Sequence, residues 1–87
     1  MPALHDPASL GAVIKQARKA AGLTQEALAA QANVSRRTLI AIESGHVRAE
    51  LGLVLAVLRA LDLELRVVAR EKPRAALEEL FAQTEEL

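Results

Sequence analysis

The stretch QEALAAQANVSRRTLIAIE, residues 25–43, contains two short segments of helical character with a break between them. Thr24 stands before the first segment and Ser35 before the second, and a hydroxyl at such a position caps the free N–H groups of a starting helix. Asn33 stands at the break, and asparagine adopts the left-handed conformation more readily than other non-glycine residues. We therefore expect two helices of about eight residues joined by a turn of three to four residues.

Apolar residues in this stretch are spaced so that the two helices pack against each other. Ala29 is expected where the crossing helices approach so closely that little beyond a methyl group fits. The residues expected to face the junction are Leu28, Ala29, Ala32, Val34, Leu39 and Ile42. Their size, spacing and turn are those of a helix-turn-helix.

Two further helices flank this pair. Asp6 followed by Pro7 is a helix start, and Gly22 is a suitable end for the same helix. Residues 50–61 are almost wholly apolar on every side, which predicts the central buried helix of a small bundle. We therefore expect a mainly α fold, with residues 1–62 as one small helical bundle that contains the helix-turn-helix.

After Asp62 the apolar period changes to two, which is the period of a half-buried strand. The alternative is that these residues extend the preceding helix, but Asp62 as a helix breaker and the pair of valines favour a strand over residues 63–70. An isolated strand leaves its backbone groups unpaired, so we expect it to pair with the same strand of a second molecule in a two-fold homodimer. The residues expected to form this dimer contact are Leu63, Leu65, Val67 and Ala69.

The register of that pairing stays open at the level of sequence. Pairing about Leu65 sets Glu64 opposite Arg66, whereas pairing about Val67 sets Glu64 opposite Arg70. Residues 71–87 follow as a C-terminal tail or short helix whose apolar residues have helical spacing.

Composition removes most other classes of protein. A chain of 87 residues without cysteine is expected to form one domain in a reducing cytoplasm, with no disulfide or thiolate metal site. We expect neither a signal peptide nor a membrane span. His5 and His46 lack catalytic or metal-ligand spacing and there is no glycine-rich phosphate loop, so we expect no enzyme, no cofactor and no metal. Phe81 is the single aromatic residue, which disfavours recognition of RNA or single strands by stacking.

The zero net charge hides an asymmetry. Residues 1–48 carry six bases against three acids, and the remainder carries five bases against eight acids. The first half therefore suits an anionic partner, and the distribution of charge within it is informative. Arg36 and Arg37 open the expected second helix of the pair, where they repel each other and the positive end of the helix dipole. This arrangement costs stability unless an anion binds.

At 100° per residue, Arg36, Arg37, Ile40 and Ser44 fall within one arc of about 100°, away from the apolar side. Guanidinium groups that extend from a helix start into a major groove can bind guanine O6 and N7. We therefore expect a double-stranded DNA operator as partner. The residues expected to contact bases are Ser35, Arg36, Arg37, Ile40 and Ala41. Those expected to contact phosphates are Gln25, Arg18, Lys19, Thr38, His46 and Arg48, whereas Glu43 is expected to bond within the domain.

The run ARKAAGLTQEALAAQANVSRRTLIAIESG, residues 17–45, resembles the Cro and phage-repressor-like (XRE) helix-turn-helix family, and the resemblance covers residues 10–61. With LDLELRVVAR, residues 61–70, added, the chain resembles the HipB-type antitoxins. This resemblance implies a lambda-repressor-like fold and a nucleoid-associated repressor that positions itself on DNA through Gln25. It also implies that the protein binds a palindromic operator as a dimer and holds a protein toxin such as a HipA-like kinase. The alternatives are a free-standing phage-type regulator or an interaction module that chiefly neutralises a toxin through its C-terminal region.

Overall fold

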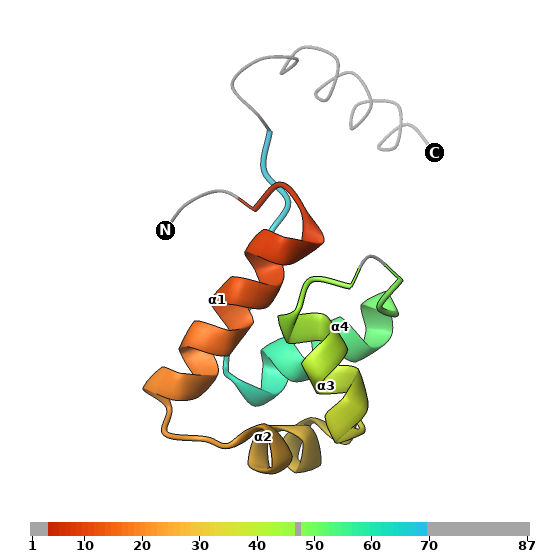
Figure 1. Ribbon diagram of the computed structural model, residues 1–87. Coiled ribbons are helices and arrows are strands. Elements are labelled where there is room, and N and C mark those ends of the chain that lie inside the picture. The colour runs from red at the N-terminus through yellow and green to blue at the C-terminus, as the bar shows by residue number, and fades with distance from the viewer. Residues whose placement is uncertain (1–3, 47, 70–87) are drawn as a thin grey trace, which may run out of the picture.

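The computed structural model describes residues 4–46 and 48–69 (Figure 1). Within them the fold is helical, with α1 (Pro7–Ala20), α2 (Gln25–Ala32), α3 (Arg36–Glu43) and α4 (Leu51–Ala60). α1 packs against α3, and α2 packs against both α3 and α4. The expected helical bundle and the expected bounds of α2 and α3 are confirmed. None of the four described helices has the length and apolarity that crossing a bilayer requires.

Side chains cap three of the helices, as the sequence predicts. The Asp6 carboxylate accepts a hydrogen bond of 2.7 Å from the Ser9 N–H at the start of α1, and this bond lowers the pKa of Asp6. The Thr24 hydroxyl accepts from the N–H of Ala27 at 3.0 Å, and the Ser35 hydroxyl accepts from the N–H of Thr38 at 3.0 Å. These bonds satisfy N–H groups that lack partners inside the helices.

The turn between α2 and α3 has the expected geometry. Asn33 has a φ of 58° and a ψ of 43°, in the left-handed region. The N–H of Val34 then bonds to the carbonyl oxygen of Ala29 at 3.0 Å. Asparagine therefore ends α2 here in the conformation that glycine often supplies.

The core takes one fully buried large side chain from each helix. These four residues are Ile14, Leu28, Leu39 and Val57. Around them lie Ala29, Ala32, Ile42, Val54 and Leu58, and Val34 is partly buried against this cluster. The junction residues predicted from the sequence are thus all part of the core.

One expectation about α4 is wrong. Its buried residues are Val54, Val57 and Leu58, whereas Leu51 is 64% exposed. Because helices pack on only one side of α4, apolar composition all around it does not make it a central buried helix.

α4 ends at Ala60, and Asp62 follows with a φ of 58°. The Leu63 N–H bonds to the carbonyl oxygen of Leu58 at 2.8 Å, which closes the end of the helix. Residues 63–69 form neither helix nor strand in this single chain, so the alternative that they continue α4 is wrong. The strand expected over residues 63–70 is not observed, and residues 70–87, including the expected tail, lie outside the described residues.

Gly11 of α1 lies directly against the backbone of α3. A Cβ atom added at Gly11 would lie 2.5 Å from the carbonyl oxygen of Ile42 and 2.7 Å from that of Glu43. Gly11 is not among the residues singled out from the sequence, although a glycine within a helical pattern is a signal of close packing. This contact fixes how α1 lies across the end of α3.

We predict that Gly11→Ala lowers the free energy of unfolding. The gain in helix propensity is about 1 kcal/mol, but the methyl group collides with rigid backbone, and such overpacking costs about 1–3 kcal/mol or more. Urea denaturation at fixed protein concentration measures the change. Gly52→Ala in α4 is the matched control, since nothing lies within 4 Å of its added Cβ. The control should be as stable as the native chain or slightly more stable, and equal stability of the two variants would contradict the close approach.

Candidate nucleic-acid interface

α3 presents a cationic outer face. Arg36 and Arg37 are exposed, and neither makes an ion pair with any residue in the described ranges. Ile40 lies on the same face and is 39% exposed, whereas Leu39 and Ile42 on the opposite side are 0% and 4% exposed. The outward arc predicted for this helix is therefore the one observed, and its two leading guanidinium groups point away from the core.

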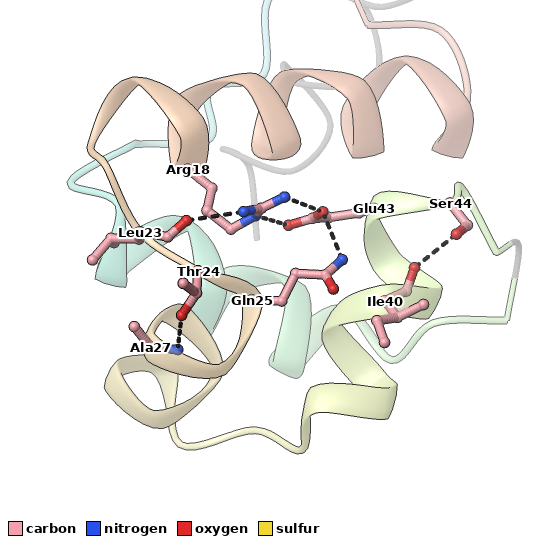
Figure 2. Close-up of polar contacts among 8 residues, drawn as sticks. All are labelled: Arg18, Leu23, Thr24, Gln25, Ala27, Ile40, Glu43 and Ser44. Carbon is pink, nitrogen blue, oxygen red and sulfur yellow. Dashed lines mark hydrogen bonds and ion pairs between the residues drawn. The ribbon is translucent and has the colours of Figure 1, made fainter.

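Local hydrogen bonds occupy the hydroxyl groups at both ends of α3. Ser35 donates its hydroxyl hydrogen to Oγ1 of Thr38 at 2.8 Å, in addition to accepting the capping bond from the Thr38 N–H. Ser44 donates to the carbonyl oxygen of Ile40 at 2.8 Å (Figure 2). Ser35 therefore serves first as a cap, whereas the hydroxyl hydrogen of Thr38 is left for another acceptor.

A buried ion pair joins α1 to the end of α3. Arg18 Nε lies 2.7 Å from Glu43 Oε2, and Arg18 Nη2 lies 3.2 Å from Oε1 (Figure 2). The third contact of this guanidinium is a bond from Nη1 to the carbonyl oxygen of Leu23 at 2.9 Å. The side chains of Arg18 and Glu43 are only 10% and 4% exposed, so this pair is bidentate and largely shielded from water.

The structure corrects the phosphate role expected for Arg18. Its guanidinium group is occupied by Glu43 and Leu23 inside the protein, and the residue is 8% exposed. The expectation that Glu43 bonds within the domain is confirmed. In the sequence, a basic residue near the end of α1 and a single acidic residue at the end of α3 could have indicated this pair. Whether Arg18 and Glu43 meet depends on how α1 crosses α3, which the sequence does not show.

Gln25 is the third member of this network. It is the first residue of α2, it is half-buried, and its Nε2 donates to Glu43 Oε1 at 3.2 Å. The amide nitrogen carries two hydrogens, so one remains for an acceptor outside the protein. Glu43 therefore orients both Arg18 and the side chain at the start of α2.

Two hollows lie along opposite edges of the outer face of α3. The first, which we call the basic hollow, has a volume of about 580 Å³. It is lined by Lys15, Arg18, Lys19, Thr24, Gln25, Glu26 and Arg36. Lys15 and Lys19 are exposed there. The sequence analysis included Lys19 but not Lys15, although a spacing of four residues places the two on one face of α1.

The second, which we call the loop hollow, has a volume of about 370 Å³. Thr38 and Ala41 of α3 line it together with His46 and Arg48 of the following loop. His46 Nδ1 accepts a hydrogen bond of 3.3 Å from the backbone N–H of Arg48. The residues expected to contact phosphates thus divide between the two edges of α3, with Arg18 removed from the set.

We predict that Glu43→Gln lowers the free energy of unfolding by about 3 kcal/mol, because it leaves the Arg18 charge buried without its counter-charge. Urea denaturation at fixed protein concentration measures the loss. Glu26→Gln is the matched control, since Glu26 is exposed, and its change should stay within about 1 kcal/mol, the contribution of a carboxylate in the first turn of a helix. A Glu43→Gln variant as stable as this control would show that the pair contributes no net stability.

Comparison with known proteins agrees with this geometry. Residues 14–68 match the family described as helix-turn-helix. Over 66 residues the chain is 36% identical to the uncharacterized HTH-type transcriptional regulator y4mF of Sinorhizobium fredii, an alignment covering 76% of this chain and 87% of that protein. It is also 44% identical over 52 residues to an uncharacterized HTH-type transcriptional regulator of Methanothermobacter thermautotrophicus, covering 60% of this chain and 75% of that protein.

Solved structures show the same fold. The HipB-O4 20mer complex matches with a TM-score of 0.76 at 21% identity, covering 82% of this chain and 100% of the other. The HipA-HipB-O2-O3 complex matches with the same score, identity and coverage. At this identity the likeness concerns the fold, whereas the family rests on the sequence matches. The chain therefore belongs to the helix-turn-helix family of transcriptional regulators.

Proposed function

We propose that this regulator is a repressor that binds a palindromic operator in double-stranded DNA as a homodimer in the cytoplasm. The observation that carries the proposal is the start of α3, where Arg36 and Arg37 are exposed and form no ion pair with a described residue. Two cations at the positive end of a helix dipole oppose folding, and a bound polyanion removes that cost. The major groove of duplex DNA is wide enough to admit an α-helix such as α3.

Base contacts are assigned to the outer face of α3. Arg36 and Arg37 are the donors for guanine O6 and N7, and Ile40 is an apolar contact for a thymine methyl group. Ala41 lies at the edge of the same face and Ser35 at its start. Because the hydroxyl of Ser35 is engaged in the cap, its contribution is smaller than that of the arginines.

Phosphate contacts are assigned to the two hollows at the edges of α3. On one side, the basic hollow offers Lys15, Lys19 and the free amide hydrogen of Gln25. On the other side, the loop hollow offers Thr38, His46 and Arg48. A helix in a major groove lies between two phosphate backbones, so donors on both edges would fix its position without selecting a sequence.

We predict that base and phosphate contacts separate in a binding experiment. Operators selected from randomised duplex DNA are titrated by fluorescence anisotropy over a range of salt concentrations. Arg36→Ala and Arg37→Ala should each weaken selected sites by about 1–3 kcal/mol per half-site and relax the preference at one base pair of each half-site. Lys19→Gln should weaken all duplexes similarly and reduce the slope of log K against log salt by about 0.9 for each subunit, or about 1.8 for the dimer.

Gln16→Ala is the control, because Gln16 is an exposed polar residue of α1 that lines neither hollow at α3 and lies away from the chain after α4. It should leave both affinity and slope unchanged. Native affinity in the Arg36→Ala, Arg37→Ala double variant would overturn the assignment of α3 to the major groove.

The homodimer is supported by the chain after α4. Leu65, Val67 and Val68 are 47%, 76% and 74% exposed in the single chain. Pairing of the strand expected over residues 63–70 with its copy would cover such side chains and satisfy the backbone groups. A two-fold dimer binds two half-sites about one helical turn of DNA apart, or a multiple of it, and its two-fold symmetry accounts for a palindromic operator.

A second candidate function is that of an antitoxin. Its support is the shared fold with HipB in a complex with HipA, together with the acidic character of the second half of this chain. A free-standing regulator remains the alternative. The two differ in whether the chain also binds a protein toxin, for example a HipA-like kinase encoded beside it.

We predict that the two activities separate by mutation. The chain is co-expressed with the toxin-like protein of the same transcript, and complex formation is measured by size-exclusion chromatography with light scattering. Deletion of residues 73–87 should abolish the complex and spare operator binding, whereas the Arg36→Ala, Arg37→Ala double variant should do the reverse. If both the full chain and the deletion variant elute free of the toxin-like protein, the antitoxin role is rejected and the regulator stands alone.

A further inference from the structure

The segment that follows α4 has unused capacity for pairing. Leu63 donates to Leu58, but within the described residues no backbone hydrogen bond is made by residues 64–69. Their side chains alternate in character and are exposed throughout. Beside them lies a hollow of about 700 Å³ whose lining includes Leu55, Leu58, Leu63 and Leu65. Arg59, Asp62 and Glu64 also line this hollow, so the surface combines free backbone groups with an open depression that leucines and charged residues line together.

We infer that a second copy of this chain occupies this surface, with residues 63–67 of the two copies paired antiparallel and the two-fold axis passing through Leu65. The inference rests on the homodimer of the proposed function and specifies its register. It assigns Leu65 to contact Leu65 of the second copy, Leu63 to contact Val67, and Glu64 to pair with Arg66.

Symmetry limits the registers that two identical antiparallel strands can adopt. The axis must be perpendicular to the ribbon, because a two-fold axis that runs along the ribbon would relate parallel strands. It preserves the side of the ribbon to which each side chain points, and residues directly opposite each other share one side. The axis must therefore pass through a residue position and not between two residues. An axis through an end residue would leave most of the segment unpaired. The five positions inside segment 63–69, which are 64 to 68, are therefore the candidates.

Charge excludes three of the five positions. An axis through Glu64 sets two carboxylates directly opposite each other, and an axis through Arg66 does the same for two guanidinium groups. An axis through Val68 sets Arg66 opposite Arg70, which are again like charges. Each of these registers places a repulsive pair at or near the centre of the ribbon.

The two remaining positions differ in how they match apolar residues. An axis through Val67 sets Leu63 opposite Glu71 and Arg66 opposite Val68. An axis through Leu65 sets every apolar residue from 63 to 67 opposite another apolar residue and sets Glu64 opposite Arg66. Of the five, this register alone satisfies both charge and polarity.

Two features of the single chain fit the Leu65 register. Arg66 Nε and Glu64 Oε2 already lie 2.8 Å apart, so the two side chains point to one side. Their side chains are 80% and 70% exposed, and pairing would build a square of four alternating charges from them. The left-handed backbone of Asp62 also ends the pairing at Leu63, in agreement with a short ribbon.

Single cysteines test this register in the full-length protein, because the native chain has none. In the inferred register the two Leu65 positions face each other with Cα atoms about 4.5–5.5 Å apart, within the range of a disulfide. The two Val67 positions are four residues apart along the ribbon, about 13 Å, which is too far. Leu65→Cys should therefore form a disulfide-linked dimer under mild oxidation on a non-reducing gel, and Val67→Cys should not.

Efficient crosslinking by Val67→Cys with none by Leu65→Cys would overturn the register. If neither variant crosslinks and light scattering finds a monomer, the dimer itself is rejected. Operator binding and its dependence on Arg36 and Arg37 are measured separately, so failure of the register and failure of the DNA-binding proposal are distinguishable.

A charge exchange provides an independent measurement. Glu64→Arg should weaken dimerisation by roughly tenfold, because it replaces two opposite-charge pairs by two like-charge pairs. The Glu64→Arg, Arg66→Glu double variant should restore the native dissociation constant, measured by analytical ultracentrifugation. In the Val67 register Arg66 faces a valine, so no such rescue is expected, and its absence would overturn the inferred register.

Discussion

The arrangement of this domain depends on the ion pair between Arg18 and Glu43. It holds α1 against the last turn of α3, and through Gln25 it reaches the first turn of α2. Taking two charges out of water is costly, and the cost is offset only when the remaining donors and acceptors are satisfied. Here the guanidinium bonds to Leu23 as well as to both carboxylate oxygens, and in the described residues no buried side-chain polar atom lacks a partner.

This pair also separates two kinds of positive charge. Arg18 is neutralised inside the domain and adds little to the external field, whereas Arg36 and Arg37 are exposed and carry their charge at the surface. The same carboxylate orients the amide at the start of α2, so one acidic residue connects the last turn of α3 with the first turn of α2. The position of α1 is then set a second way by the close contact at Gly11, where two carbonyl groups leave no space for a side chain.

The sequence was most informative where a local chemical rule decides the structure. Thr24, Asn33 and Ser35 predicted the ends of α2 and α3, because caps and left-handed turns depend on the residue itself. The outward arc of α3 followed from helical period alone. Contacts set by the crossing of helices were not predictable in this way: Arg18 and Glu43 are 25 positions apart, and Gly11 is significant only because α3 passes over it. The exposure of Leu51 was missed for a related reason, since apolar composition does not reveal which side of a helix other elements cover.

The outer residues of α3 make few contacts with the rest of the domain. Arg36 and Arg37 are exposed and Ile40 is partly so, whereas the residues that hold the helix in place lie on its other side. The side chains proposed to contact bases and the side chains that hold α3 in place therefore occupy different positions of one eight-residue helix. Under the proposed function, gene duplicates of such a regulator can acquire new target sites by exchanging two or three side chains without disturbing the core, and the same separation makes the protein a suitable starting point for engineered specificity.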